Sequence, residues 1–219
     1  MKRLFSHAIG HVGVGMMRLL APLPLAWLRA IGAGLGVLLY MLARPRRRIV
    51  QVNLALCFPE LSTHERAKLM RQVFVRFTQA WLDRSWLWHG SRTVLARRIK
   101  LTGEVAALQS THQLVLFCPH FVGLDVGVIA VTMHGLRPLC SIYSRQRNRV
   151  VDQWVLTGRQ RFAGMRLFPR HVGMRELAKS LSEGEALYLL PDMDFGTHGA
   201  EFVPFFGVPA ATVTSLSRF

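Results

Sequence analysis

Two side chains near the middle of the chain could carry acid–base chemistry. His120 and Asp125 lie five positions apart in the segment LFCPHFVGLDVG, residues 116–127. A carboxylate that holds one imidazole nitrogen fixes the tautomer of the ring and raises its basicity, so the other nitrogen can take a proton from a hydroxyl nucleophile. The spacing therefore suits a histidine general base oriented by an aspartate. The alternative is that His120 only caps a helix and Asp125 faces solvent.

The surrounding residues predict a strand before this pair and a helix after it. Residues 113–118 form a short apolar run, the proline before His120 stops the strand, and Gly123 permits a tight turn. A helix over 124–133 would place Asp125 in its first turn, where the helix dipole favours a carboxylate. Ligand sites of open α/β sheets lie beyond the carboxyl ends of the strands, which is where His120 falls.

The same alternation of short apolar runs and helical segments continues along the chain. Strands are predicted at 98–102, 113–118, 138–143 and 186–190, and helices at about 62–88, 124–133, 150–162 and 173–182. Ser62 and Glu65 have the spacing of a capping box at the start of the first helix. Alternating strands and helices predict an α/β fold, a mostly parallel sheet flanked by helices on both faces.

The composition favours a membrane surface over nucleic acid as a partner. The chain has 28 Lys and Arg against 12 Asp and Glu, a formal charge of +16, and yet 51% of its residues are hydrophobic. A protein that sits on an anionic membrane and handles acidic ligands needs both a basic face and apolar surface. We therefore expect no nucleic-acid partner. The three cysteines lie far apart without a CxxC pair, which indicates neither a disulfide framework nor a zinc site.

Residues 1–48 are predicted to be a membrane-anchoring N-terminal segment with a basic flank. Between positions 9 and 43 only two arginines are charged, and the apolar run ends at RPRRR, residues 44–48. Positively charged residues next to a membrane segment stay on the cytoplasmic side. The chain that follows is therefore expected in the cytoplasm.

How this N-terminal segment meets the membrane has three interpretations. Residues 19–43 are long enough to cross a bilayer, which takes about 20 apolar residues. Pro22 and Pro24 would break or kink a helix there, which favours a re-entrant or interfacial helix pair. A secretory signal peptide is the third interpretation.

Several segments, taken in order, resemble a known family. The block around His120 resembles the H-x4-D/E motif of membrane acyltransferases, which move a fatty acyl group from a carrier thioester to a lipid hydroxyl. More closely, the sequence resembles the late acyltransferases of lipid A biosynthesis, the lauroyl and myristoyl transferases of Gram-negative bacteria. The segments are NLALCFPELS (53–62), PHFVGLDVG (119–127), YSRQRN (143–148), RQRF (159–162), SEGEALYLLPDMDFG (182–196) and FVPFFGVPAAT (202–212).

This resemblance implies a site and a mechanism. His120 would be the general base that deprotonates an acceptor hydroxyl, which attacks the thioester of acyl carrier protein, with Asp125 orienting the imidazole. Many members carry Glu at the second position, so Asp, which is one methylene shorter, requires a closer backbone. The tetrahedral oxyanion needs hydrogen-bond donors, and Arg159 or Arg145 are the candidates, with phosphate binding as their other possible role. The fold would be like that of the glycerolipid acyltransferases, at the cytoplasmic face of the bacterial inner membrane, without a cofactor.

Further side chains would contact the substrates. The resemblance implies an anionic glycolipid as acceptor and an acidic protein as donor, which basic side chains can neutralise. The predicted substrate-binding residues are Arg147, Asn148, Arg161, Glu185, Asp192 and Asp194. The spacing of the last two would suit Mg²⁺, but acyl transfer needs no metal and none is expected. Phe202, Phe205 and Phe206 either line the acyl slot or belong to the core.

Two other functions stay open on the sequence. One is a glycerolipid acyltransferase that uses acyl-coenzyme A or acyl carrier protein, and the other is a non-catalytic protein that binds anionic lipid or nucleic acid through its basic surface. Members of the resembled family continue for several elements after FFGVPAAT, whereas this sequence stops at TSLSRF. The acyltransferase α/β domain, residues 49–219, is therefore expected to be truncated at its C-terminus.

Overall fold

The computed structural model describes residues 2–193, 196 and 200–218. Within them the chain forms two compact units. The first contains the residues up to Pro22 together with Arg84–Leu190, and the second contains Leu23–Asp83 together with Pro191–Arg218. The long helix α4 (Thr63–His89) contributes residues to both units.

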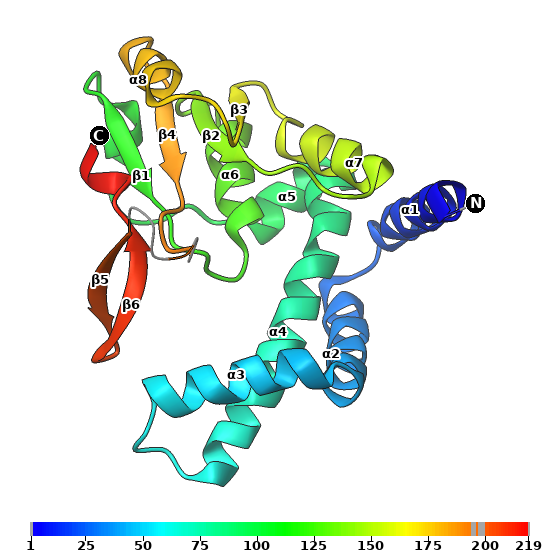
Figure 1. Ribbon diagram of the computed structural model, residues 1–219. Coiled ribbons are helices and arrows are strands. Elements are labelled where there is room, and N and C mark those ends of the chain that lie inside the picture. Colours follow the sequence, from blue (N-terminus) through cyan, green and yellow to red (C-terminus); the bar gives the residue numbers. More distant parts are fainter. Residues whose placement is uncertain (1, 194–195, 197–199, 219) are drawn as a thin grey trace. The chain divides into compact units, whose positions relative to one another are not determined.

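A parallel four-stranded sheet forms the centre of the first unit. Its strands are β1 (Leu114–Phe117), β2 (Leu139–Tyr143), β3 (Met165–Pro169) and β4 (Ala186–Leu189), in the order β1-β4-β2-β3 (Figure 1). All three pairings are parallel, so all four carboxyl ends lie along one edge. The predicted α/β fold with a parallel sheet is confirmed.

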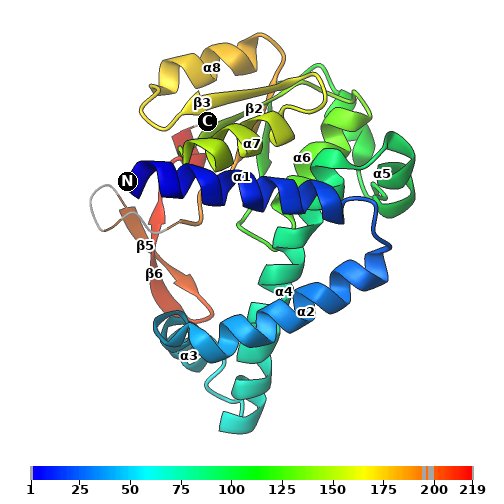
Figure 2. The same cartoon turned by 90° about the vertical axis from the view of Figure 1, so that its right-hand side faces the viewer.

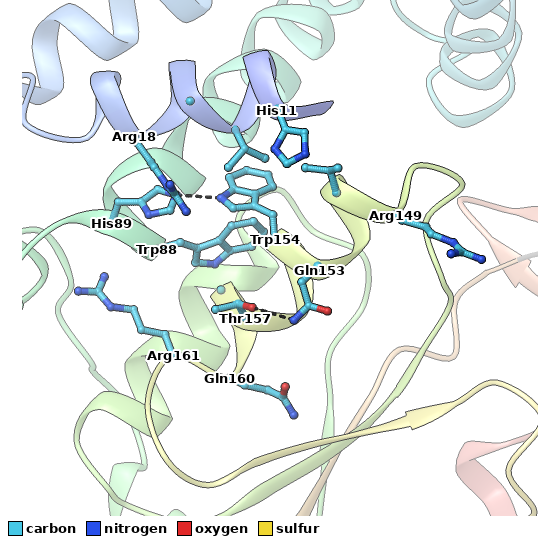
Figure 3. Close-up of a pocket in the computed structure, with 14 residues that line it drawn as sticks. His11, Arg18, Trp88, His89, Arg149, Gln153, Trp154, Thr157, Gln160 and Arg161 are labelled. Atoms are coloured by element: carbon cyan, nitrogen blue, oxygen red, sulfur yellow. Dashed lines mark hydrogen bonds between the residues drawn. The ribbon is translucent and has the colours of Figure 1, made fainter. Parts of the chain in front are cut away.

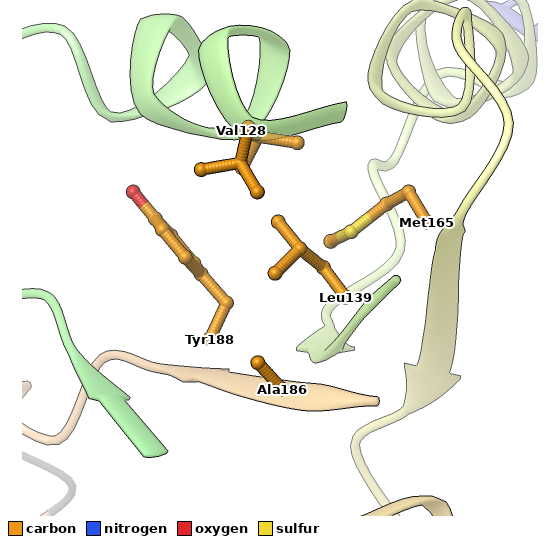
Figure 4. Packing of buried hydrophobic residues seen from close by; sticks show 6 residues of the cluster. Val128, Leu139, Met165, Ala186 and Tyr188 are labelled. Carbon is orange, nitrogen blue, oxygen red and sulfur yellow. The ribbon is translucent and has the colours of Figure 1, made fainter. Parts of the chain in front are cut away.

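One face of the sheet packs against helix α6 (Leu124–Met133). Val128 on this helix lies over Leu139 on β2 and Tyr188 on β4, and all three are buried (Figure 4). Met165 on β3 and Ala186 on β4 extend the same cluster along the sheet. Burial of such apolar side chains is the main favourable term that holds the helix to the sheet.

The opposite face of the sheet packs against helix α8 (Met174–Ser182). Leu187 and Leu189 on β4 point to this side and contact Leu177 and Leu181 of the helix. Successive side chains of a strand point to opposite faces, which is why Leu187 belongs here while its neighbours Ala186 and Tyr188 face α6. Because both faces are covered, β4 is a continuous apolar run.

Three more helices and a 3₁₀ turn complete the first unit: α1 (Lys2–Leu20), α5 (Arg92–Arg98), α7 (Arg149–Arg159) and η1 (Val105–Gln109). Helix α1 lies beside α7 (Figure 2). The two helices meet at Gly10, where a Cβ atom would lie 2.7 Å from Oδ1 of Asn148. This contact allows the N-terminal helix to pack closely on the α/β domain.

The second unit contains α2 (Leu25–Leu42), α3 (Arg44–Cys57), the first part of α4, the antiparallel hairpin of β5 (Ala200–Phe205) and β6 (Val208–Val213), and η2 (Leu216–Arg218). Gly32 and Gly36 let α2 approach α4, and Thr78 Oγ1 donates to the Gly32 carbonyl at 2.6 Å. Arg29 of α2 pairs with Asp83 of α4 at 2.9 Å.

Helix α2 is long and apolar enough to cross a membrane by length and composition. Among the described residues it is the one helix that meets this criterion, and 17% of its 18 residues are buried. It begins after Pro24, whereas α1 ends at Leu20, so the predicted break at the two prolines is confirmed.

The predicted secondary structure differs from the structure in several places. No strand forms over residues 98–102, because α5 extends to Arg98 and an irregular segment follows it. The sequence analysis also missed β3 and the hairpin of β5 and β6, and it predicted no helix where α3 forms. The capping box is confirmed, since Ser62 N and Oγ donate to Glu65 Oε2 at 2.8 and 2.7 Å.

Candidate active site

The turn between β1 and α6 exposes His120. The N–H of Cys118 still donates to the carbonyl of Leu189 on β4 at 2.8 Å, and Pro119, which has no N–H, then ends this ladder. Gly123 adopts a φ of 94°, a left-handed conformation that suits glycine, and α6 begins at the next residue. His120 therefore lies in an exposed loop at the carboxyl edge of the sheet, where the sequence predicts it.

Asp125 is buried in the first turn of α6, where two arginines hold it. Its relative exposure is 6%. Oδ2 accepts from Nε of Arg84 at 2.8 Å and is 2.7 Å from Nη2 of the same residue, while Oδ1 accepts from Nε of Arg159 at 2.9 Å. The two arginine side chains are 23% and 28% exposed. A buried carboxylate needs such partners, and here two guanidinium groups supply them.

Arg159 lies at the junction of three elements. It ends α7, pairs with Asp125 of α6, and places its guanidinium 5.7 Å from the ring centre of Tyr143 at the end of β2. The Tyr143 hydroxyl donates to Asp152 of α7, which fastens the end of β2 to that helix. Arg145 is exposed in the loop between β2 and α7. The predicted roles of Arg159 and Arg145 toward an oxyanion or a phosphate stay predictions.

The buried Tyr188 and the half-buried Cys118 lie close to each other near the sheet end that precedes α6. The Tyr188 hydroxyl donates to the carbonyl of Leu124 at 3.2 Å, and burial raises the pKa of Tyr188, so the hydroxyl keeps its proton. Burial also raises the pKa of the Cys118 thiol. Because the thiolate is the nucleophilic form of cysteine, covalent catalysis by Cys118 is disfavoured at neutral pH.

Two of the predicted substrate-binding residues bond to the protein itself. Asn148 caps α7, since its Oδ1 accepts from the N–H groups of Val150 and Val151 at 2.9 and 3.2 Å, and its Nδ2 donates to the carbonyl of Ser6. Arg161 donates to the carbonyls of Leu87 and Gly90 at the end of α4. Arg147 is exposed in the loop that precedes Asn148. Contacts of these residues with a substrate stay predictions.

The predicted acidic residues are not gathered around His120. Glu185 directly precedes β4 and therefore lies at the amino end of the parallel strands, whereas His120 lies beyond their carboxyl ends. It pairs with Arg166 at 2.7 Å. Asp192 is exposed, and Asp194 lies outside the described residues. Among the residues that the structure describes, no group of three or more His, Cys, Asp or Glu side chains could hold a metal ion.

The three predicted acyl-slot phenylalanines belong to the hairpin of the second unit. Phe202, Phe205 and Phe206 are all exposed. Phe206 has a φ of 52° in the turn and contacts the rings of Phe205 and Phe58, whose centres lie 4.8 and 5.0 Å away. The alternative that they are buried core residues is wrong, and the acyl slot stays a prediction.

Sequence reasoning missed Arg84. It lies in the last part of α4, 41 positions before the carboxylate that it holds, and belongs to no motif around His120. No local sequence pattern could have identified Arg84, because only the folded structure brings this residue close to Asp125.

The chain is similar to known proteins along almost its whole length. Residues 2–219 match the family of bacterial lipid A biosynthesis acyltransferases. The chain belongs to this family. The match covers both compact units and includes the turn that carries His120.

Individual relatives carry related names. The chain is 30% identical over 212 residues to a lipid A biosynthesis acyltransferase of Haemophilus influenzae, which covers 94% of the chain and 65% of that protein. It is 28% identical over 221 residues to the lipid A biosynthesis lauroyltransferase of Escherichia coli, covering 96% and 71%. For the myristoyltransferase of the same organism the identity is 30% over 210 residues, covering 94% and 64%. The chain thus spans about two thirds of the length of these relatives.

Proposed function

We propose that this protein transfers a fatty acyl group to a hydroxyl of a lipid A precursor, with acyl carrier protein as the donor. Membership of the lipid A acyltransferase family supports the reaction and the acceptor class. The names of the relatives specify lauroyl and myristoyl groups for those proteins. The observation that carries the proposal is the family match together with an exposed histidine at the carboxyl edge of the sheet.

In this proposal His120 is the general base. It takes the proton of the acceptor hydroxyl while the hydroxyl oxygen bonds to the carbonyl carbon of the thioester. The tetrahedral intermediate then expels the thiolate as the C–S bond breaks, and the imidazolium returns its proton to that sulfur. The products are an ester and the free thiol of the carrier, with all atoms balanced and no cofactor required.

The charges around Asp125 support a role in positioning. Three arginine N–H groups contact its two oxygens, and a carboxylate has about four acceptor sites, so it can still accept from an imidazole N–H. We therefore propose that Asp125 orients the imidazole ring of His120. Arg159 or Arg145 would stabilise the developing oxyanion or bind a phosphate of the acceptor, because guanidinium groups suit both anions.

The location proposed is the cytoplasmic face of the bacterial inner membrane. Helix α2 is apolar over 18 residues, and α3 begins with the basic sequence RPRRR. Anionic lipids on the cytoplasmic leaflet attract such basic clusters by roughly 1 kcal/mol for each charge near the surface. The lipid acceptor would then reach the enzyme within the membrane plane.

The proposal is tested by measuring acyl transfer by the purified chain in detergent micelles with two donors and two acceptors. Acyl carrier protein thioesters with a lipid A precursor should give product, whereas acyl-coenzyme A with lysophosphatidic acid should not. His120→Ala should abolish turnover, while His134→Ala, which changes an exposed histidine at the end of α6, should retain it. Product only with lysophosphatidic acid would instead assign a glycerolipid acyltransferase.

A further inference from the structure

A cavity in the first unit is lined by none of the residues of the turn that carries His120. Its volume is ≈ 910 Å³, and it is bounded by α1, by the end of α4 and by α7 (Figure 3). His11 and Arg18 enter it from α1, and Trp88 enters it from α4. All of its lining residues belong to one compact unit, so the cavity is formed within that unit.

The cavity is strongly positive. Three arginines line it, Arg18, Arg149 and Arg161. His11 and His89 are also in the lining, but burial lowers the pKa of His89, so its imidazole adds no charge at neutral pH. None of the described residues that line it is acidic. A concave surface with charges of one sign concentrates ligands of the opposite sign. An anion is therefore the expected ligand.

The cationic groups differ in what they already bind. Arg161 donates to the carbonyls of Leu87 and Gly90. Its main contribution to the cavity is therefore its positive charge. Arg18 and Arg149 are exposed at the rim. Arginine is the side chain best suited to phosphate, because its N–H groups match the oxygens in pairs.

Apolar groups form the other part of the lining. Trp88 and Trp154 are buried, with ring centres 4.3 Å apart in an edge-to-face arrangement. The Trp154 indole donates to Nε2 of His89 at 2.8 Å, so the remaining ring N–H of a neutral His89 is on Nδ1. Val14 and Val150 complete the apolar surface. This lining suits a carbon skeleton attached to the anion.

We propose that this cavity binds a phosphate group that carries an apolar substituent. Arg18 pairs with the phosphate oxygens, the two tryptophan rings contact the substituent, and Arg149 at the opposite rim adds positive charge. A phospholipid and a free phosphate share the anionic group, but only the phospholipid uses the apolar surface. The lining of the cavity includes neither His120 nor Asp125, but it shares Arg161 with the predicted substrate-binding residues. The proposal does not depend on acyl transfer.

A ligand in this cavity would contact the helices that hold Asp125. Its walls come from α4 and α7, the two helices whose Arg84 and Arg159 hold Asp125. Gly158 on α7 and Gln160 just after it line the cavity, while Arg159 between them reaches Asp125. A ligand that fills the cavity therefore braces the two helices that position this carboxylate.

Isothermal titration calorimetry of the full chain in an uncharged detergent tests the proposal. The probes are dihexanoyl phosphatidic acid, inorganic phosphate and dihexanoylglycerol, which lacks the phosphate. Saturable binding of phosphatidic acid but not of dihexanoylglycerol is expected. If inorganic phosphate binds as tightly as phosphatidic acid, the tryptophans do not contribute to binding. If dihexanoylglycerol binds as tightly as phosphatidic acid, the cavity is not a phosphate site.

Paired variants locate the binding. Gly15 lines the cavity and Gly13 does not, and a Cβ atom at either position meets nothing within 4 Å. Gly15→Leu should fill the cavity and weaken phosphatidic acid binding by about tenfold or more, whereas Gly13→Leu should not. Arg18→Gln should weaken it by a similar factor, whereas Arg175→Gln, on the exposed side of α8, should not. Equal affinities in all four variants would place the ligand elsewhere.

Discussion

At the residue scale, Asp125 concentrates the charge interactions of the site. Its carboxylate joins α4 and α7 to the first turn of α6 through Arg84 and Arg159. Such a group is costly to bury alone, and its removal takes from two partly buried guanidinium groups a carboxylate that both contact. Substitutions that remove or keep the charge of Asp125 therefore distinguish its contribution to stability from its proposed role in orienting His120.

Asp125→Asn should lower the free energy of unfolding by about 2 to 3 kcal/mol, below the value for a fully buried pair because both arginines retain some contact with water. Asp125→Glu keeps the charge and should cost less. Urea denaturation followed by tryptophan fluorescence measures both variants. An Asn variant as stable as the unchanged protein would contradict the assigned ion pairs.

The residues of the candidate site were predictable only where local sequence decides them. The loop position of His120 and the helical position of Asp125 follow from the proline, the glycine and the apolar runs around them. The arginine partners do not, because Arg84 is distant in sequence and long side chains reach across elements. For the same reason Arg161, predicted to bind substrate, bonds to the end of α4.

At the element scale, α2 packs on α4 through glycines four residues apart. A Cβ atom at Gly36 would lie 2.5 Å from Cα of Val75, and one at Gly32 would lie 2.8 Å from the side chain of Gln79. Small residues at this spacing let two helix backbones approach closely, as they do in membrane proteins. The contact ties the apolar helix α2 to the rest of its unit.

Gly36→Ala should destabilise this unit by about 1 to 3 kcal/mol, because the backbone of α4 has to move away. Gly34 provides the matched control on the same helix, since a Cβ atom there meets nothing within 4 Å. Gly34→Ala should be neutral or stabilising by up to about 1 kcal/mol through helix propensity. Thermal unfolding in detergent compares the two, and similar shifts in both variants would show that the helices do not meet at Gly36.

The elements were predictable where period and boundary signals agreed. Helix α6 has the predicted bounds because a glycine precedes it and an apolar run follows Asp125 in its first turn. The strand predicted at 98–102 does not form, because Arg98 belongs to the end of α5. The negative end of the helix dipole favours a positively charged side chain there. The hairpin was missed because Pro204 and Pro209 argue against strands, although a two-stranded ribbon tolerates them at its free edges.

At the scale of the whole molecule, the account requires attachment to a membrane through α2. Leu35 and Leu38 are exposed on this helix at 43% and 46%. An aspartate near the centre of a membrane helix costs about 3 kcal/mol. Leu35→Asp combined with Leu38→Asp should therefore release the protein from membranes during an alkaline carbonate wash.

The control for this release is Gln51→Asp combined with Asn53→Asp, which adds the same charge to exposed positions of α3. This control should stay in the membrane pellet. If the α2 variant also stays there, α2 is not the anchor. If both variants are released, charge alone determines the attachment.

The most direct test of the central claim is mass spectrometry of lipid A from Gram-negative cells with and without this protein. The account predicts that the unchanged chain increases the mass of lipid A by one acyl group. His120→Ala, produced in equal amount, should leave the mass as it is in cells without the protein, while His134→Ala should act like the unchanged chain. Lipid A that gains the same acyl group from the His120→Ala variant would contradict the account.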